Sequence, residues 1–291
     1  MKTSAIIRVI AILFFTFFIM IPFFVIGRLV TGLDILDPDA QTTSFQEVVM
    51  SFFICSSMFF AVWVFTRFGD ELHFKSNGFS LKGAFQESFL GLLCGTIAII
   101  LGFLILLLWG KIVPETIDFN LMEFFWLGVL YFFVAVGEEI LFRGYLLRNL
   151  LLATNKPIAL LVSSFIFAGA HAGNPNFGII PFFDLVLFGL LCGIAFLYTK
   201  RLWFPIALHF SWNFIQSLVG FNVSGQESYK VMKLEMHGAD YITGGAFGFE
   251  GSLLSLAIQS VLLIALILYF PKSPSTLPTQ PTRLTHSTLK Q

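Results

Sequence analysis

Long stretches without a single charged side chain constrain the fold of this chain more than any other feature. Three of them cover residues 9–27, 48–66 and 88–110, and a fourth, 251–270, closes the apolar region. An α-helix of about 20 apolar residues crosses the hydrocarbon core of a bilayer. Each of these stretches therefore predicts a membrane-spanning helix.

The composition excludes a soluble globule. Hydrophobic residues make up 57% of the chain and charged residues only 12%, too few to cover a soluble protein of this size. A net charge of zero also argues against nucleic acid as a partner, because phosphates require a basic surface. Cys55, Cys94 and Cys192 lie inside apolar runs, where we expect small packing residues rather than a disulfide or a thiolate metal site.

The middle of the chain is apolar but interrupted by ionisable and small residues. We expect four more helices there, at residues 121–152, 157–172, 179–199 and 202–220. Together with the four uninterrupted stretches, they give about eight spans. The fold class that we predict is therefore all-α, a polytopic membrane helix bundle.

Lysine and arginine positions orient this bundle. With eight spans and both termini in the cytoplasm, thirteen of the 17 basic residues fall on or near the cytoplasmic side. Only four fall outside, namely Arg28, Lys111, Lys230 and Lys233. This asymmetry follows the positive-inside rule, so we expect both termini to be cytoplasmic.

The rest of the chain divides simply. Residues 1–270 are expected to form a single transmembrane domain, whereas 271–291 are rich in Ser, Thr and Pro and predict a disordered polar tail. Residues 221–250 predict a longer outer loop. The glycine-rich stretch 244–248 within that loop suggests a turn that re-enters the bundle closely.

The first polar cluster in the predicted spans begins with adjacent glutamates. Adjacent residues of a helix point about 100° apart, so Glu138 and Glu139 cannot share a face. Glu139 and Arg143 stand at i and i+4 with the acid first, the favourable order for an ion pair. Glu138 then points elsewhere, toward the face of Phe142. The alternative is an ordinary charged turn at the end of a span.

The second cluster ends at His171. Small residues at 168–170 allow a neighbouring helix to approach closely. A lone histidine near a helix end is more often a satisfied interfacial residue than a catalyst. However, the midpoint between Glu138 and His171 falls in the turn at 153–157, whose Asn155 and proline favour a helix start. An antiparallel hairpin about this turn brings the two side chains to the same depth.

The third cluster is His209 and Asn213, which share a helix face at i and i+4. Both side chains can donate hydrogen bonds, as an oxyanion requires, although a polar clamp between helices is the alternative. Three further acids, Glu47, Glu123 and Asp184, each lie within a few residues of an expected span end. We expect those three to be interfacial or capping residues.

These clusters, in this order, resemble the CPBP family of intramembrane proteases, also called the CAAX-protease and bacteriocin-processing or Abi family. That family has three signatures: a double glutamate followed by arginine, an aromatic residue four positions before a histidine, and a histidine four positions before an asparagine. In this sequence they are Glu138-Glu139 with Arg143, Phe167 with His171, and His209 with Asn213. The resemblance covers about residues 120–215, which would be the catalytic core.

The resemblance implies an intramembrane endopeptidase in a multi-pass membrane protein. Glu138 and His171 would activate a water, while His209 and Asn213 would form the oxyanion hole. Structural support would come from the remaining signature residues, Glu139, Arg143 and Phe167. The implied partners are the lipid bilayer and a membrane-embedded or lipid-anchored peptide substrate. Because the compact chain shows no targeting signal, we expect a bacterial inner membrane as its location.

Alternatives remain open at this stage. We expect no obligatory cofactor, but Glu138, His171 and His209 could instead bind catalytic zinc as a two-histidine, one-carboxylate set. A non-catalytic adaptor or immunity protein could keep the same scaffold. A transporter would also concentrate carboxylates and histidines in mid-membrane, but the sequence has no repeat architecture or pair of broken helices.

Overall fold

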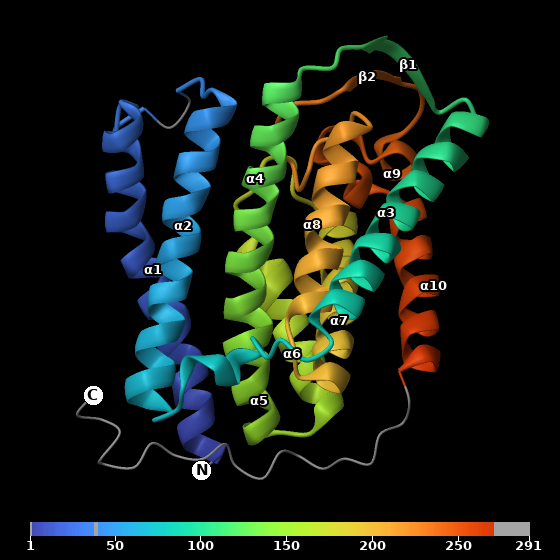
Figure 1. Ribbon diagram of the computed structural model, residues 1–291. Coiled ribbons are helices and arrows are strands. Elements are labelled where there is room, and N and C mark those ends of the chain that lie inside the picture. Colours follow the sequence, from blue (N-terminus) through green and yellow to red (C-terminus); the bar gives the residue numbers. More distant parts are fainter. Residues whose placement is uncertain (1, 38–39, 271–291) are drawn as a thin grey trace.

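The computed structural model describes residues 2–37 and 40–270 and shows a bundle of mostly helical segments (Figure 1). A helix occupies each of the eight regions that the sequence predicts. These helices are α1 (Lys2–Thr31), α2 (Ser44–Val64), α3 (Ala84–Leu108), α4 (Leu121–Glu139), α6 (Lys156–Ala170), α7 (Ile179–Thr199), α8 (Trp203–Leu218) and α10 (Leu253–Tyr269). The predicted tail lies outside the described residues.

Shorter elements extend or connect these helices. Two π-helical segments continue a long helix directly, η1 (Phe65–Gly69) after α2 and η3 (Ile140–Leu147) after α4, and α5 (Arg148–Ala153) then completes the α4 rod. The remaining short helices are η2 (Phe74–Asn77), α9 (Asp240–Thr243), η4 (Gly245–Phe247) and η5 (Phe249–Gly251).

Five of the described helices are long and apolar enough to cross a membrane. They correspond to α1, α2 with η1, α3, the α4–η3–α5 rod, and α7. By contrast, α6, α8 and α10 contain 15, 16 and 17 residues. At 1.5 Å per residue α6 is about 22 Å long, shorter than a hydrocarbon core of about 30 Å. The chain is a multi-pass membrane protein, but the count of eight full spans is not confirmed.

The described residues are mostly helical, as predicted, but they also include one small sheet that the sequence did not predict. Strands β1 (Ile112–Ile117) and β2 (Met232–Met236) form an antiparallel pair, with Ile112 opposite Met236 and Ile117 opposite Met232. This sheet lies at the end of the bundle opposite the N-terminus (Figure 1). Its strands are 115 residues or more apart in sequence, so no hairpin pattern could have revealed their pairing.

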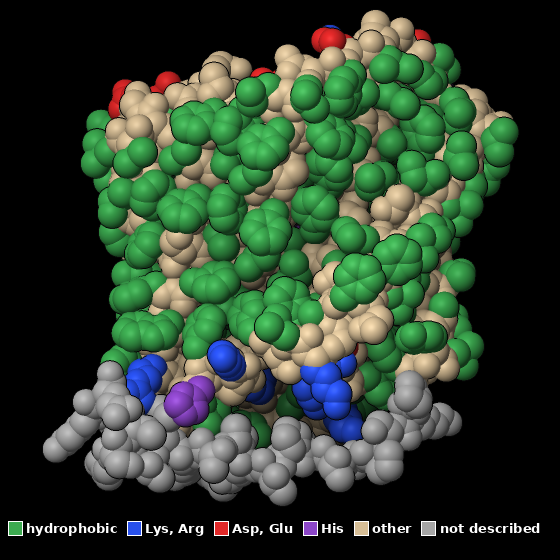
Figure 2. Space-filling model, in the orientation of Figure 1, with side chains coloured by type: hydrophobic (Ala, Val, Ile, Leu, Met, Phe, Trp, Pro, Cys, Tyr) green, Lys and Arg blue, Asp and Glu red, His purple; other side chains and the backbone are tan. Residues whose placement is uncertain are grey.

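The surface separates into three zones (Figure 2). Hydrophobic side chains cover the middle of the visible face, Lys and Arg gather at the end that carries the N-terminus, and Asp and Glu appear at the opposite end. An apolar belt between polar ends is the arrangement that a bilayer requires.

Glycines bring the helices around the later signatures close together. On α3, a Cβ at Gly91 or Gly95 would overlap the backbone of α8. On α7, a Cβ at Gly189 would lie 2.8 Å from Cβ of Ser164 on α6. Backbones can approach this closely only where small residues meet. These contacts set the positions of α8, which carries His209, and of α6, which His171 directly follows.

The three isolated acids differ in their surroundings. Glu47 and Glu123 lie in the first turns of α2 and α4, as expected for residues at helix ends. Asp184 was expected at an interface, but it is fully buried and accepts a hydrogen bond of 2.6 Å from Gln259 on α10. A polar partner from a helix 75 residues away makes this burial possible.

The outer segment re-enters the bundle as the glycine-rich stretch suggested. Gly244 and Gly248 have φ angles of +93° and +101°, which L-residues with side chains rarely adopt. The turn between them delivers the rings of Phe247 and Phe249 into the core, where both are buried.

Candidate active site

The α4–η3–α5 rod and α6 form the antiparallel hairpin that joins the first two signatures. Asn155 caps α6 by accepting a hydrogen bond from the backbone N–H of Ile158, so the chain reverses at the predicted turn. Ala153 lies fifteen positions after Glu138, and α6 contains fifteen residues. Oε2 of Glu138 consequently lies 3.7 Å from Nε2 of His171, the residue that follows α6.

The neighbouring glutamate is an anchor for the third signature. Oε1 of Glu139 accepts a 2.7 Å hydrogen bond from Nη1 of Arg143, and the Nδ1 atom of His209 lies 3.0 Å from the same oxygen. All three side chains are buried. The other ring nitrogen of His209, Nε2, lies 4.0 Å from Oε2 of Glu138. The two adjacent glutamates therefore diverge, as expected, but contact opposite sides of one imidazole.

Hydrogen-bond partners determine which nitrogen of each ring carries a proton. Nδ1 of His171 lies 2.9 Å from the carbonyl oxygen of Phe167, which can only accept, so Nδ1 must donate. Nδ1 of His209 likewise donates to Glu139. When each ring is neutral, this bonding pattern leaves a lone pair on both Nε2 atoms.

Both Nε2 atoms lie near a third hydrogen-bond acceptor, Oε2 of Glu138. Oε2 of Glu138 is buried and has no hydrogen-bond partner among the described residues. Its side chain is 18% exposed and that of His171 is 14% exposed, so the site is accessible rather than sealed. Acceptors that face one another without a donor are unfavourable. A hydrogen-bond donor or a positive charge between the three acceptors would stabilise this arrangement, and a water, a proton or a cation could supply it.

An aromatic wall holds the rings in place. The ring of Phe167 packs against Arg143, whose guanidinium carbon lies 4.3 Å from the ring centroid, and against His171 at 4.8 Å. Phe188, on α7, lies edge-on to His209 with the centroids 5.1 Å apart. The aromatic residue of the second signature thus contacts both the ion pair and a histidine, in keeping with a structural role.

Asn213 is buried on α8, one turn beyond His209. None of the contacts described here links its amide to Glu138 or to either histidine. Its role in an oxyanion hole therefore stays a prediction, based on the shared helix face and on its burial.

The two glutamates lie where the rod changes from α-helix to π-helix. Glu139 is the last residue of α4, and all eight residues of the π-helical segment η3 are buried. Short π-helical turns inside helices are frequent at functional sites. This turn keeps Arg143 beneath the glutamates, where Nη2 also lies 3.5 Å from the carbonyl oxygen of Gly189.

Sequence reasoning missed one buried acid close to the site. Glu250, in η5, is only 4% exposed and accepts a hydrogen bond of 3.2 Å from Nε1 of Trp212, the residue before Asn213. It lies in a segment interpreted as an outer loop and belongs to none of the signatures. One feature of the sequence could have revealed Glu250: it lies between Phe249 and Gly251, directly after the glycine-rich stretch that was expected to re-enter the bundle.

A metal ion would need some rearrangement here. Within residues 2–37 and 40–270, no three His, Cys, Asp or Glu side chains already lie close enough together to hold one. The donor types nevertheless suit zinc: Glu138 Oε2 lacks a partner, and both histidines direct an unprotonated Nε2 toward it. The hydrogen bonds at the two Nδ1 atoms are also of the kind that orient metal-bound histidines.

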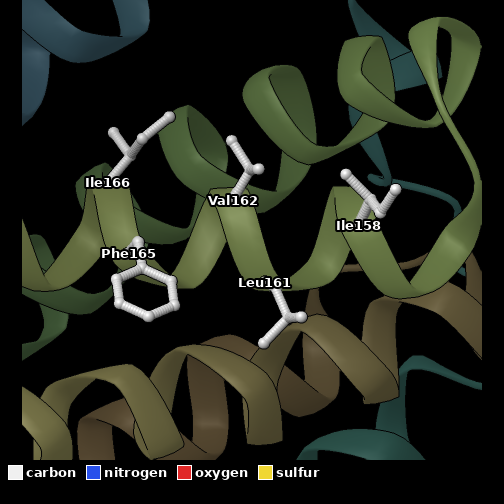
Figure 3. Close-up of a pocket in the computed structure, with 5 residues that line it drawn as sticks. All are labelled: Ile158, Leu161, Val162, Phe165 and Ile166. Atoms are coloured by element: carbon white, nitrogen blue, oxygen red, sulfur yellow. The ribbon is translucent and has the colours of Figure 1, made fainter.

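An apolar groove on the outer face of α6 is separate from these groups (Figure 3). Only aliphatic and aromatic side chains line it, namely Ile158, Leu161, Val162, Phe165 and Ile166. None of them can take part in acid–base chemistry, so this groove is not the candidate active site.

Comparison with known proteins gives a match to the segment that contains the three signatures. No curated protein and no solved structure matches the chain. Residues 120–215 match the family model described as type II CAAX prenyl endopeptidase Rce1-like. The matched residues begin just before α4 and end within α8, and they include all three signatures. At residues 120–215, the chain therefore carries a domain of the CAAX-protease (CPBP) family.

Proposed function

We propose that this protein is an intramembrane endopeptidase that hydrolyses a peptide bond with a water activated by Glu138 and His171. The observation that carries the proposal is the convergence of acceptors without donors: Oε2 of Glu138 faces Nε2 of His171 at 3.7 Å and Nε2 of His209 at 4.0 Å. A water between the carboxylate and an imidazole donates to both and directs its own lone pair outward.

The reaction balances with these groups alone. The water oxygen attacks the carbonyl carbon of the scissile peptide while its proton passes to Glu138 or His171, and the carbonyl oxygen becomes an oxyanion. Collapse of this intermediate breaks the C–N bond, and the proton moves to the leaving amine. The products are a carboxylic acid and an amine.

The oxyanion would be stabilised by His209 and Asn213. Because Nδ1 of His209 already donates to Glu139, its Nε2 can donate only when the ring is an imidazolium. Glu139 fixes the orientation of the ring through Nδ1, and Arg143 holds the Glu139 carboxylate in place. One such donor contributes about 3 kcal/mol to the transition state.

The substrate class follows from the surroundings of the site. The catalytic groups lie about halfway along the α4 rod, within an apolar bundle, so a substrate must enter from the bilayer or carry a lipid anchor. We therefore propose a membrane-embedded or lipid-anchored peptide, cleaved in a bacterial inner membrane. The basic end would face the cytoplasm.

Replacing the general base tests the proposal. In proteoliposomes that contain an internally quenched farnesylated CAAX peptide or an N-acylated peptide, we expect Glu138→Gln to lower turnover by about 100-fold or more. Peptidomics of membranes from cells expressing wild type or Glu138→Gln would identify natural products. Glu235→Gln is the matched control, since Glu235 is an exposed glutamate on β2. Equal turnover by Glu138→Gln and wild type would overturn the role of Glu138, and the absence of turnover in both would leave the adaptor alternative.

A metal-dependent version of the same hydrolysis is the second candidate, supported by the donor types of Glu138, His171 and His209. Zinc held by these residues would polarise the water and the peptide carbonyl. We expect activity to survive dialysis against a strong chelator, with turnover measured on the same peptides. Loss of activity on chelation and recovery with stoichiometric zinc would establish the metal-dependent version instead.

A further inference from the structure

We propose that Glu250 is a positioning residue for this reaction. It lies outside the family-matched residues 120–215, and it links the two arms of the active site. The His171 arm is the loop 171–178 between α6 and α7, and the α8 arm is the helix that carries His209 and Asn213. The inference rests on the proposed function.

Both oxygens of the Glu250 side chain are occupied. Oε1 accepts the indole N–H of Trp212 at 3.2 Å, and Oε2 accepts both the backbone N–H and the hydroxyl of Ser224 at 2.8 Å. Two of these three donors are N–H groups, one at each carboxyl oxygen, and an N–H group cannot accept a hydrogen bond from a carboxyl proton. Burial raises the pKa of Glu250 above its ordinary value, and the hydrogen bonds from Ser224 oppose part of that rise.

On one side, the contacts lead to His171. The carbonyl oxygen of Ser224 accepts a 2.9 Å hydrogen bond from Nδ2 of Asn174, and the backbone N–H of Asn174 donates to the carbonyl oxygen of His171 at 2.9 Å. Gly225 lies so close to Pro175 that a Cβ would collide with the proline carbonyl. The turn held by Glu250 therefore packs directly against the His171 arm.

On the other side, the contacts lead to the α8 arm. Trp212 immediately precedes Asn213, and its ring lies 5.5 Å from that of Phe188, which in turn lies 5.1 Å from the ring of His209. The carboxylate thus fixes the indole that supports both predicted oxyanion donors. A shift of about 1 Å between catalytic groups can lower a rate about 100-fold, so a residue that holds both arms can affect catalysis without touching substrate.

The test uses the full-length protein in nanodiscs with the quenched peptides named above. We expect Glu250→Gln to lower kcat by about 10- to 100-fold and leave KM within about twofold, because the arms are misaligned while the substrate path is intact. Glu250→Asp keeps the charge and should recover part of kcat. Hydrogen exchange, which needs no turnover, should become faster at the Ser224 amide and across residues 171–178.

The matched control is Gln259→Ala. It also removes buried hydrogen bonds, but the partners of Gln259 are Asp184 and Ser255, and no hydrogen bond among the described residues links these two to Glu138, to Asn213 or to either histidine of the site. A kcat for Glu250→Gln equal to that of Gln259→Ala, or unchanged exchange in the His171 arm, would overturn the positioning role. Because the exchange measurement does not depend on hydrolysis, failure of the proposed function through Glu138→Gln remains distinguishable from failure of this inference.

Discussion

At the scale of single residues, the two adjacent glutamates have opposite surroundings. The Glu139 carboxylate is saturated by a guanidinium and an imidazole, whereas Oε2 of Glu138 is buried without a donor. A buried charge is tolerated only where partners compensate the loss of water, as they do for Glu139. A buried acceptor without a donor lowers the stability of the fold, but it remains free to bind a water or a substrate group. Identical side chains one position apart therefore differ in role because their neighbours differ.

This contrast gives a prediction for stability. Glu139→Gln leaves the buried guanidinium of Arg143 without its anion and should destabilise the fold by about 3–5 kcal/mol. Glu138→Gln removes no partner and should leave the unfolding temperature close to that of wild type. Thermal unfolding of the two variants in the same detergent measures the difference. Equal losses would mean that Glu138 has a structural partner.

At the scale of elements, small residues decide how closely the helices that carry the site can pack. Gly189 of α7 lies against Ser164 of α6, and Gly193, one turn further along α7, lies against Leu160. The short helix α6 ends at mid-bundle, so His171 stands at a helix end rather than on a helix face. Helix length and glycine contacts together set the depth and direction of this side chain.

Substituting the contact glycine tests this packing. In Gly189→Ala the new Cβ would lie 2.8 Å from Cβ of Ser164 and 2.9 Å from its Cα, so α6 and α7 must separate. We expect a loss of about 1–3 kcal/mol in unfolding free energy. Gly169→Ala, on α6, is the control: no atom lies within 4 Å of the new Cβ, so stability should hold or rise slightly. Similar losses in both variants would argue against close packing.

At the scale of the whole molecule, the two ends of the bundle differ in charge and in structure. The end with the N-terminus displays Lys and Arg, and the other carries the β1–β2 pair and visible Asp and Glu (Figures 1 and 2). The β1–β2 pair joins the α3–α4 connection to the segment that holds Glu250. One end therefore displays basic side chains, while at the other end the β1–β2 pair links two connecting segments.

The charge difference predicts the orientation. We expect His237→Cys, next to β2, to react with a membrane-impermeant maleimide in intact cells, and His73→Cys, at the other end, to react only after permeabilisation. Both histidines are exposed, and Cys55 and Cys192 are buried, which keeps the background low. The wild-type chain corrects for any labelling of Cys94. The reverse labelling pattern would require the termini to lie outside.

Local sequence determined much of this protein. Apolar runs located the helices, the i and i+4 spacing indicated the Glu139–Arg143 ion pair, and the turn at 153–157 brought Glu138 level with His171. These features depend on residues close together in the chain, so periodicity and turn chemistry reveal them.

Only the tertiary structure decided the rest. Asp184 is buried because Gln259 reaches it from a distant helix, the strands pair across more than a hundred residues, and Glu250 meets Trp212 through a re-entrant turn. Even the protonated nitrogen of His209 depends on a glutamate 70 positions earlier. Burial and hydrogen bonding are properties of neighbours in space, and those neighbours exist only once the helices have packed.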